Sequence, residues 1–293
     1  KAIAHLPAIR DLVHLTLTQS GEGRQKHAAP IDISESAIVG QDLYFNAWVS
    51  LSNTTQSVWK TNGLGAVKLM EHTVSSNLQS GFTEFGGLVY FAATAAGSGR
   101  ELWKTDGTPA GTTMAVDVIP GSTGSDPRQL KVFDSKLFFT ASTTETVYQT
   151  DGTSVGTTAI IDGDTKWSFF GLDAGTNPVA VTNSKLILKR ETIAGGIDLL
   201  AMDTAMSVPT VIQHFSPEPN RTYIVNTFTV VGNQVFFLRG NTAADSQFSG
   251  ELWKSNGTVA GTAAVSSNKL WNALERNDKF IGKYTSISFS PVV

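Results

Sequence analysis

One twelve-residue stretch, Glu101–Thr112 (Glu-Leu-Trp-Lys-Thr-Asp-Gly-Thr-Pro-Ala-Gly-Thr), constrains the fold of this 293-residue chain more than any other feature. It returns almost unchanged at Glu251–Thr262 and in altered form at Val58–Val67 and Val147–Thr157. A stretch that returns at a fixed period is typical of repeat architectures, in which one supersecondary unit is used several times. The structure and number of these units therefore decide the fold.

Each copy predicts a β-hairpin. A short run with an aromatic residue ends at Asp106-Gly107, and Asp-Gly between apolar runs is a strong hairpin signal because Gly adopts positive φ and Asp tolerates it. The chain then continues through Thr112–Val118, a β-branched run of strand character. We assign a structural role to the repeat positions Trp59, Trp103, Asp106, Gly107, Tyr148, Asp151, Gly152, Trp253, Asn256 and Gly257.

A second marker upstream of each copy gives the period. It is a strand-like run that ends in bulky apolar residues and follows a polar or glycine pair. Its last residues are Phe45, Phe91, Phe139, Leu188 and Phe237, at steps of 46, 48, 49 and 49 residues. This second hairpin makes about four strands per unit. The third-strand aromatics agree, except that the gap from Tyr148 to Trp253 is two periods long and contains one degraded unit.

Four-stranded units of about 40 to 50 residues, repeated radially, are typical of a β-propeller. We therefore predict an all-β fold, a propeller of four-stranded antiparallel blades, with residues 1–293 as a single domain of six blades. Five blades are expected at about 34–72, 83–119, 128–163, 178–214 and 226–266. A composite sixth blade from residues 10–33 plus 270–293 would pair the chain ends and protect edge strands. Five blades with extensions are the alternative.

Composition narrows the partners and the compartment. The net charge is −3 with 16% charged residues and no basic stripe, so we expect no nucleic-acid partner. No apolar run approaches the roughly 20 residues that span a bilayer, so we expect no membrane insertion. Many Thr, Ser, Gly and Asn residues favour an extracellular or cell-surface protein. The absence of cysteine excludes disulfides and thiolate chemistry.

Motifs that could carry catalysis have simpler interpretations in this chain. Gly152–Gly156 matches the Gly-x-Ser-x-Gly nucleophile elbow, but that motif needs a strand-to-helix turn, and its Ser position is Pro109 or Val259 in sister copies. The five histidines show no metal-ligand spacing. Each Asp-Gly turn supplies one acidic ligand where calcium needs several. We therefore predict no catalytic residue, no metal and no cofactor.

The connectors between blades hold the candidate contact residues. They are rich in Gly, Ser, Pro and Asp and should emerge on one face of the ring. Their densest polar groups, together with tryptophans outside the repeat, give the candidate ligand or partner contacts Asp162, Asp164, Trp167, His214, Glu218, Arg221 and Trp271. Paired carboxylates can hydrolyse glycosides, but a sequence gives no distance between them.

The repeat resembles a known motif. Glu101–Thr112 is similar to the ELWxxDGTxxGT repeat of hyalin-like and other large bacterial secreted or surface proteins. The flanking runs agree: Asp117–Gly121 follows this copy, and Leu137–Ala141 lies upstream of the next copy at Val147–Thr157. Two copies match almost fully, two partly, and one is degraded, over about residues 37–266. The resemblance implies an exported, repeat-built propeller used for adhesion or assembly.

Two functions follow as hypotheses. The first is a non-catalytic propeller that serves as a protein-binding, scaffold or adhesion module in an extracellular or surface assembly, because unequal blades make an asymmetric site that suits a protein partner. The alternative is glycan recognition, as a carbohydrate-binding lectin or, less favoured, as a glycoside hydrolase. A lectin would be favoured by nearly equal blades with a shared aromatic and polar pair in every connector, which this sequence lacks.

Overall fold

The computed structural model describes residues 33–48, 55–73, 81–141, 146–160, 179–182, 184–192, 196–203, 208–216, 222–242 and 248–265. Regular structure in these ranges is entirely β-strand, in five four-stranded antiparallel sheets. The described ranges contain no helix that is long and apolar enough to cross a membrane. The composite sixth blade falls outside the described residues, apart from Ile33.

Each sheet uses four consecutive strands, hydrogen-bonded in chain order. The first three sheets are β1 (Ile33–Val39), β2 (Asp42–Trp48), β3 (Thr55–Thr61) and β4 (Ala66–Thr73); β5 (Thr83–Phe85), β6 (Leu88–Ala95), β7 (Gly99–Thr105) and β8 (Thr113–Val116); and β9 (Pro127–Phe133), β10 (Lys136–Ala141), β11 (Thr146–Thr150) and β12 (Thr158–Ala159). The last two are β13 (Val179–Val181), β14 (Leu186–Glu191), β15 (Ile197–Met202) and β16 (Thr210–Phe215); and β17 (Thr222–Val231), β18 (Gln234–Thr242), β19 (Phe248–Ser255) and β20 (Ala263–Ala264). This meander is the strand order of a propeller blade.

The fourth strand of three sheets carries the same irregularity. The register with the third strand skips Leu69 in β4, Ala115 in β8 and Ile212 in β16. A β-bulge of this kind places one extra residue opposite its partner and bends the strand. Leu69 and Ile212 are only 4% and 6% exposed. The bulge therefore turns an apolar side chain of an outer strand into the core.

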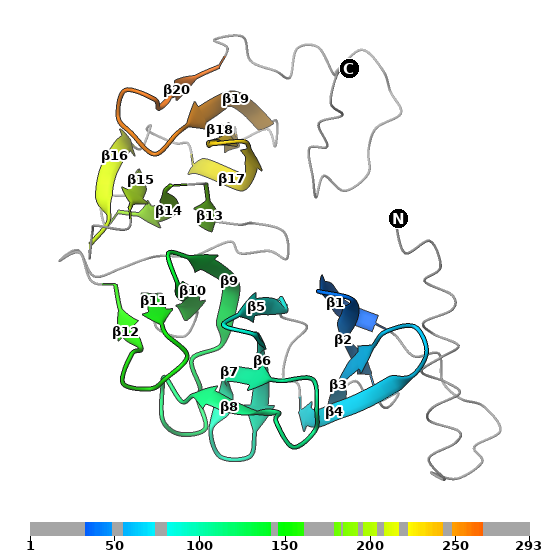
Figure 1. Ribbon diagram of the computed structural model, residues 1–293. Coiled ribbons are helices and arrows are strands. Elements are labelled where there is room, and N and C mark those ends of the chain that lie inside the picture. The colour runs from blue at the N-terminus through cyan, green and yellow to red at the C-terminus, as the bar shows by residue number, and fades with distance from the viewer. Residues whose placement is uncertain are drawn as a thin grey trace. The chain divides into compact units, whose positions relative to one another are not determined.

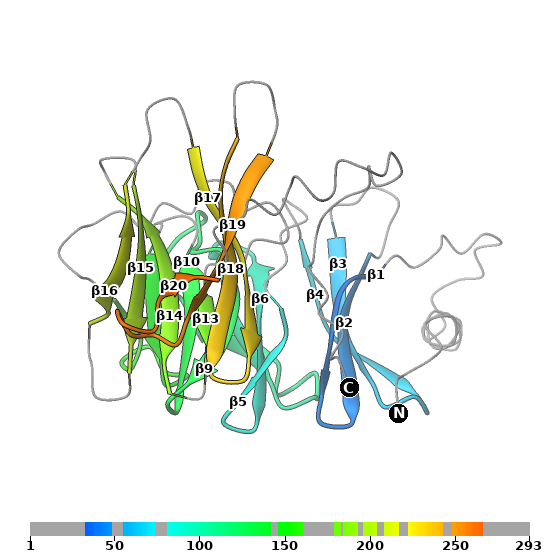
Figure 2. The same cartoon turned by 90° about the horizontal axis from the view of Figure 1, so that it is seen from above.

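The chain divides into two compact units, Lys1–Ala159 and Ile160–Val293. Unit 1 contains the first three sheets, in which β1, β5 and β9 are neighbours and β4, β8 and β12 lie on the outside (Figure 1). Thr83 Oγ1 on β5 donates to Leu130 O on β9 at 3.4 Å. Figure 2 shows the strands of the first sheet side by side along their length.

Two apolar seams join the sheets of unit 1. The seam between the first and second sheets contains Tyr44, Val58, Phe82, Val89 and Phe91, with Trp103 packed against it. The seam between the second and third sheets contains Tyr90, Leu102, Leu130, Leu137 and Phe139, with Tyr148 packed against it. Side chains alternate between the faces of a strand, so adjacent residues of β6 enter different seams. Burial of each large apolar side chain contributes about 1.5–3 kcal/mol.

Unit 2 contains the fourth and fifth sheets and one seam between them. Its core includes Ile187, Leu199, Phe215 and Phe237, with Trp253 packed against it. The rings of Phe215 and Trp253 meet edge to face with centroids 5.0 Å apart, a geometry that aromatic pairs prefer. The third-strand aromatic residue of the repeat thus stands in the seam that its sheet makes with the preceding one.

The Asp-Gly-Thr stretch closes the hairpin between the third and fourth strands with a fixed set of hydrogen bonds. Asp106 Oδ1 accepts from the N–H and the hydroxyl of Thr108 at 2.8 and 2.7 Å. Thr105 Oγ1 accepts from Gly107 N at 3.0 Å, and Thr112 Oγ1 donates to Thr108 O at 2.7 Å. The same bonds recur around Asp151 and Asn256. Each Asp or Asn side chain therefore holds its own turn.

These hairpin loops also touch the preceding sheet. An added β-carbon at the turn glycine would meet a side chain there: Gly107 approaches Tyr44 and Lys60, Gly152 approaches Tyr90, and Gly257 approaches Lys185. The three glycines have φ of 88°, 91° and 83°, a region that strongly favours glycine. The repeat therefore needs glycine both for the turn and for the close approach to the neighbouring sheet.

Candidate functional site at the connector end of the sheets

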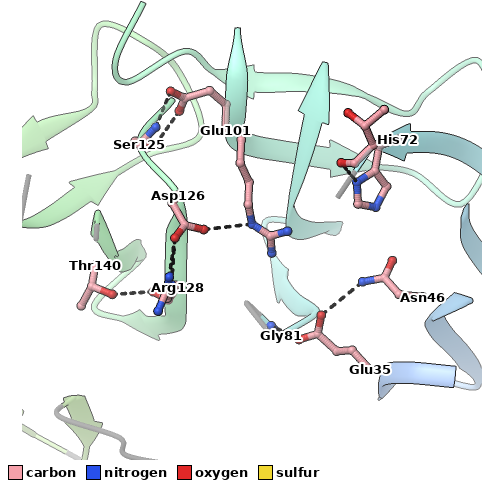
Figure 3. Close-up of polar contacts among 11 residues, drawn as sticks. Glu35, Asn46, His72, Gly81, Glu101, Ser125, Asp126, Arg128 and Thr140 are labelled. Atoms are coloured by element: carbon pink, nitrogen blue, oxygen red, sulfur yellow. Dashed lines mark hydrogen bonds and ion pairs between the residues drawn. The ribbon is translucent and has the colours of Figure 1, made fainter. Parts of the chain in front are cut away.

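The two ends of the sheets in unit 1 differ in chemistry. The turn end carries the Asp-Gly loops. The opposite end, which we call the connector end, carries the β6–β7 turn and the connector from β8 to β9 at residues 117–126. Buried polar and charged side chains gather there, as Figure 3 shows. Since binding residues are disproportionately found on loops held by a rigid scaffold, the connector end is the candidate site.

A buried carboxylate anchors the β8–β9 connector. Glu101, which is 0% exposed, accepts hydrogen bonds from Val118 N and Ile119 N at 3.1 Å each, from Ser125 N at 2.8 Å and from Ser125 Oγ at 2.5 Å. Burial raises the pKa of the Glu101 carboxyl, and these hydrogen bonds oppose the shift. Between the anchored residues, Pro120–Thr123 are exposed. The connector consequently presents an exposed tip on a fixed base.

Two glycines let the connector lie directly against β7. Arg100 and Gly124 form a parallel bridge, and Asp126 N donates to Arg100 O at 2.9 Å. A β-carbon on Gly99 or Gly124 would collide with the backbone opposite, and their φ values are 67° and 66°. Residues other than glycine are therefore excluded at this crossing, both because a β-carbon would collide and because φ is positive.

An ion cluster links the three sheets of unit 1. Asp126 lies 2.5 Å from Arg128 Nη2 and 3.1 Å from Arg100 Nε. Asp126 has φ of 49°, which is uncommon for a residue other than glycine. Glu35 on β1 accepts from Gly81 N and, at 3.2 Å, from Asn46 Nδ2. Burial lowers the pKa of Arg100, and the charges of Asp126 and Glu35 oppose this shift. The cluster thus runs from the first sheet to the start of β9.

His72 lies near the end of β4 in the same region and is 4% exposed. Its Nδ1 is 3.3 Å from Thr73 O, and because a carbonyl only accepts, Nδ1 carries the proton. Burial, together with the charge of Arg100, lowers the pKa of His72 to about 4. The imidazole is therefore neutral at pH 7.

Unit 2 carries a second row of charged residues across three strands. Arg190 Nη2 donates to Asp198 Oδ2 at 2.6 Å, and His214 Nδ1 lies 2.6 Å from Asp198 Oδ1. The carboxylate is buried, whereas the His214 side chain is 49% exposed. A buried carboxylate on one ring nitrogen fixes the orientation of an imidazole. His214 therefore offers a positioned ring edge on the surface of this unit.

The fifth sheet places an arginine at the matching position. Arg239 Nη1 is 3.4 Å from Glu251 Oε2, and its guanidinium lies 5.1 Å from the ring centroid of Phe215. Trp253 Nε1 donates to Glu251 Oε2 at 3.2 Å. The carboxylate thus satisfies both the guanidinium and the indole at this seam.

Among the sequence-predicted contact residues, His214 lies in the described part of the chain. The others, which lie outside it, are Asp162, Asp164, Trp167, Glu218, Arg221 and Trp271. Ser154 of the Gly-x-Ser-x-Gly match is exposed in the hairpin between β11 and β12. In the described ranges, no three His, Asp or Glu residues are grouped so as to hold a metal ion.

Sequence reasoning missed the polar residues of the connector end. Glu101 was visible as the first residue of the repeat, but nothing in the motif shows that its carboxylate turns toward the β8–β9 connector. Arg100 and Asp126 are joined only by the fold, because the charged partner lies 26 residues away along the chain. The available signal was the pair of glycines, Gly99 and Gly124, that precede these segments.

No family model matches the sequence, and no curated protein matches it either. Several solved structures share its fold. A puromycin hydrolase is 12% identical with a TM-score of 0.56, over 84% of this chain and 39% of that chain. A puromycin-hydrolyzing peptidase of Mycobacterium tuberculosis is 11% identical with a TM-score of 0.53, over 82% and 38% of the two chains. The chain thus spans about two fifths of the length of these structures.

These neighbours are propeller-like folds. With the four-stranded antiparallel sheets in meander order, they identify the fold as a β-propeller. At such low sequence identity the likeness concerns the fold alone, and a propeller fold hosts many functions.

Proposed function

We propose that this chain is a non-catalytic β-propeller module that binds a protein partner through the connector end of its sheets, within an extracellular or cell-surface assembly. The observation that carries the proposal is the β8–β9 connector, where the buried Glu101 carboxylate holds the base and leaves Pro120–Thr123 exposed. A loop that is ordered before binding loses little entropy when a partner arrives.

The charges around the connector support recognition by a macromolecule. The two positive charges of Arg100 and Arg128 are offset by the negative charges of Asp126 and Glu35, so this group of residues is close to electrically neutral. A fixed and neutral polar surface favours specific hydrogen bonding over long-range attraction of one charge type. The resemblance to ELWxxDGTxxGT-repeat proteins supports the further proposal of adhesion or scaffolding in a surface assembly.

Two other functions are separate outcomes of the test. Glycan recognition remains the alternative from the sequence. Hydrolysis is the other, because the similar solved structures include a hydrolase and a peptidase by name. Each has its own assay, a glycan array for the first and release of amine from aminoacyl amides for the second.

The test compares substitutions at the two ends of unit 1. Ser122→Arg with Thr123→Arg changes the exposed connector tip, and Ser154→Arg with Val155→Arg makes a matched change in an exposed loop of the turn end. Each protein is immobilised on a support and incubated with an extract of its native source. Captured proteins are crosslinked and identified by mass spectrometry. We expect one partner that wild type and the turn-end variant retain and the connector-end variant loses at least tenfold.

Glycan binding without a protein partner would replace the proposal with a lectin. Turnover of an aminoacyl amide would replace it with an enzyme. Equal capture by both variants would show that the connector tip is not the contact surface.

A further inference from the structure

Three buried polar groups at the seam between the first and second sheets lack a hydrogen-bond partner among the described residues. They are His72 Nε2, Asn46 Oδ1 and Trp103 Nε1. His72 and Asn46 are each 4% exposed. An unpaired polar group in a protein interior destabilises the fold, and such groups are nearly always satisfied in native structures by protein or by ordered water.

The register places Asn46 and His72 on one face of the first sheet, which faces the seam. Asn46 is paired with Val58, and Val58 with Met70, which precedes His72 by two residues on β4. Residues directly opposite or two apart share one face of a sheet. Val58 belongs to the apolar cluster of this seam, and Met70 and Trp103 both pack against it. Figure 3 shows the His72 and Asn46 side chains in the same part of the seam.

The hydrogen-bond roles of the three groups are fixed by their other contacts. Asn46 Nδ2 donates to Glu35 Oε2, so Asn46 Oδ1 is the carbonyl oxygen and can only accept. His72 Nδ1 carries the ring proton, so Nε2 also accepts. Trp103 Nε1 can only donate. The seam therefore offers two acceptors and one donor to whatever occupies it.

We propose that this seam binds internal water, which donates to His72 Nε2 and Asn46 Oδ1 and accepts from Trp103 Nε1. Water has both capacities, whereas an ammonium group cannot accept and a simple anion cannot donate. Buried water typically makes about three hydrogen bonds to groups that are otherwise unsatisfied. The first–second seam is thus hydrated at its polar end and dry at the apolar cluster below.

The seam of unit 2 supplies a matched control. Trp253 holds the position in β19 that Trp103 holds in β7, and its indole N–H donates to Glu251 at 3.2 Å. In unit 2 the Glu251 carboxylate accepts the indole hydrogen bond that water accepts from Trp103 in the proposed site of unit 1. The two indoles therefore predict opposite results in one experiment.

The experiment measures magnetisation transfer from water to indole protons in the full-length 15N-labelled protein. The chain has six tryptophans, so the Trp103 and Trp253 signals are assigned from the spectra of Trp103→Phe and Trp253→Phe. We expect a direct cross-peak of the sign given by long-lived water at the Trp103 indole and none at Trp253. His72→Phe and, separately, Asn46→Leu should reduce the Trp103 cross-peak several-fold while the Trp253 signal stays unchanged.

A crystal structure of the wild type gives an independent readout. It should show water within hydrogen-bond distance of both His72 Nε2 and Asn46 Oδ1. The proposal is overturned if these atoms are bonded to protein groups, or if the Trp103 cross-peak is absent from a folded wild-type protein. A cross-peak that is unchanged in the folded variants would equally overturn the assigned partners.

Discussion

A single buried histidine makes the stability of unit 1 depend on pH. The pKa of His72 falls from its ordinary value of 6.5 to about 4 because the ring is buried near Arg100. The neutral ring is favoured in the folded chain, so the unfolded chain binds the extra proton between pH 6.5 and 4. Stability from this group is complete above pH 6.5 and is lost as the pH falls through that window. The fall in the pKa of His72 from 6.5 to about 4 corresponds to about 3 kcal/mol of stability.

His72→Phe should remove this part of the acid sensitivity. The free energy of unfolding, measured in urea at pH 7 and pH 4.5, is expected to fall less for the variant than for wild type, by roughly 2–3 kcal/mol. Equal losses for wild type and His72→Phe would contradict the assignment.

At the scale of one element, the Asp-Gly-Thr loop shows why the repeat has a second glycine. A β-carbon on Gly111 would collide with the carboxylate of Asp106, and the same clash recurs at Gly156 and Gly261. That carboxylate is held in place by Thr108. The clash therefore cannot be relieved without loss of the turn hydrogen bonds.

Gly111→Ala should destabilise the protein by about 1–3 kcal/mol, the usual cost of forcing extra atoms into a packed site. Gly65→Ala is the matched control, since Gly65 lies in the corresponding loop of the first sheet and a β-carbon added there would meet no atom within 4 Å. It should be neutral or slightly stabilising. Thermal unfolding of both variants decides the point, and equal melting temperatures would show that Asp106 can move aside.

The same element shows how far the sequence could predict the structure. Asp106-Gly107 and its sister pairs predict hairpins from local chemistry alone, and the Phe91-type markers predict the second strands, both of which the structure confirms. The ion pair of Arg100 with Asp126 could not be predicted, because it depends on how a nonlocal connector crosses β7. The partner of Glu101 was hidden for the same reason. Local strand propensity and the repeat period therefore predict the sheets, whereas the candidate site depends on contacts between neighbouring sheets, which the sequence does not show.

At the scale of the whole molecule, we predict that the equivalent first strands of the sheets stand around one axis. Ile38 on β1, Val132 on β9 and Val230 on β17 hold equivalent positions, each next to the turn into the second strand. All three side chains are exposed, at 59%, 37% and 43%. We predict that the five sheets and the composite sixth blade together make a ring in which these residues face the centre. The six-blade count and the single-domain organisation remain predictions.

The most direct test is a pair of distances from pulsed electron paramagnetic resonance. The chain has no cysteine, so engineered cysteines are the only labelled sites. In a six-bladed ring the first sheet is two steps from both the third and the fifth. The Ile38→Cys/Val132→Cys and Ile38→Cys/Val230→Cys pairs should therefore give similar distances, roughly 20 Å for packed sheets about 10 Å apart. A much shorter second distance would indicate five blades, and one far longer than the first would contradict the ring.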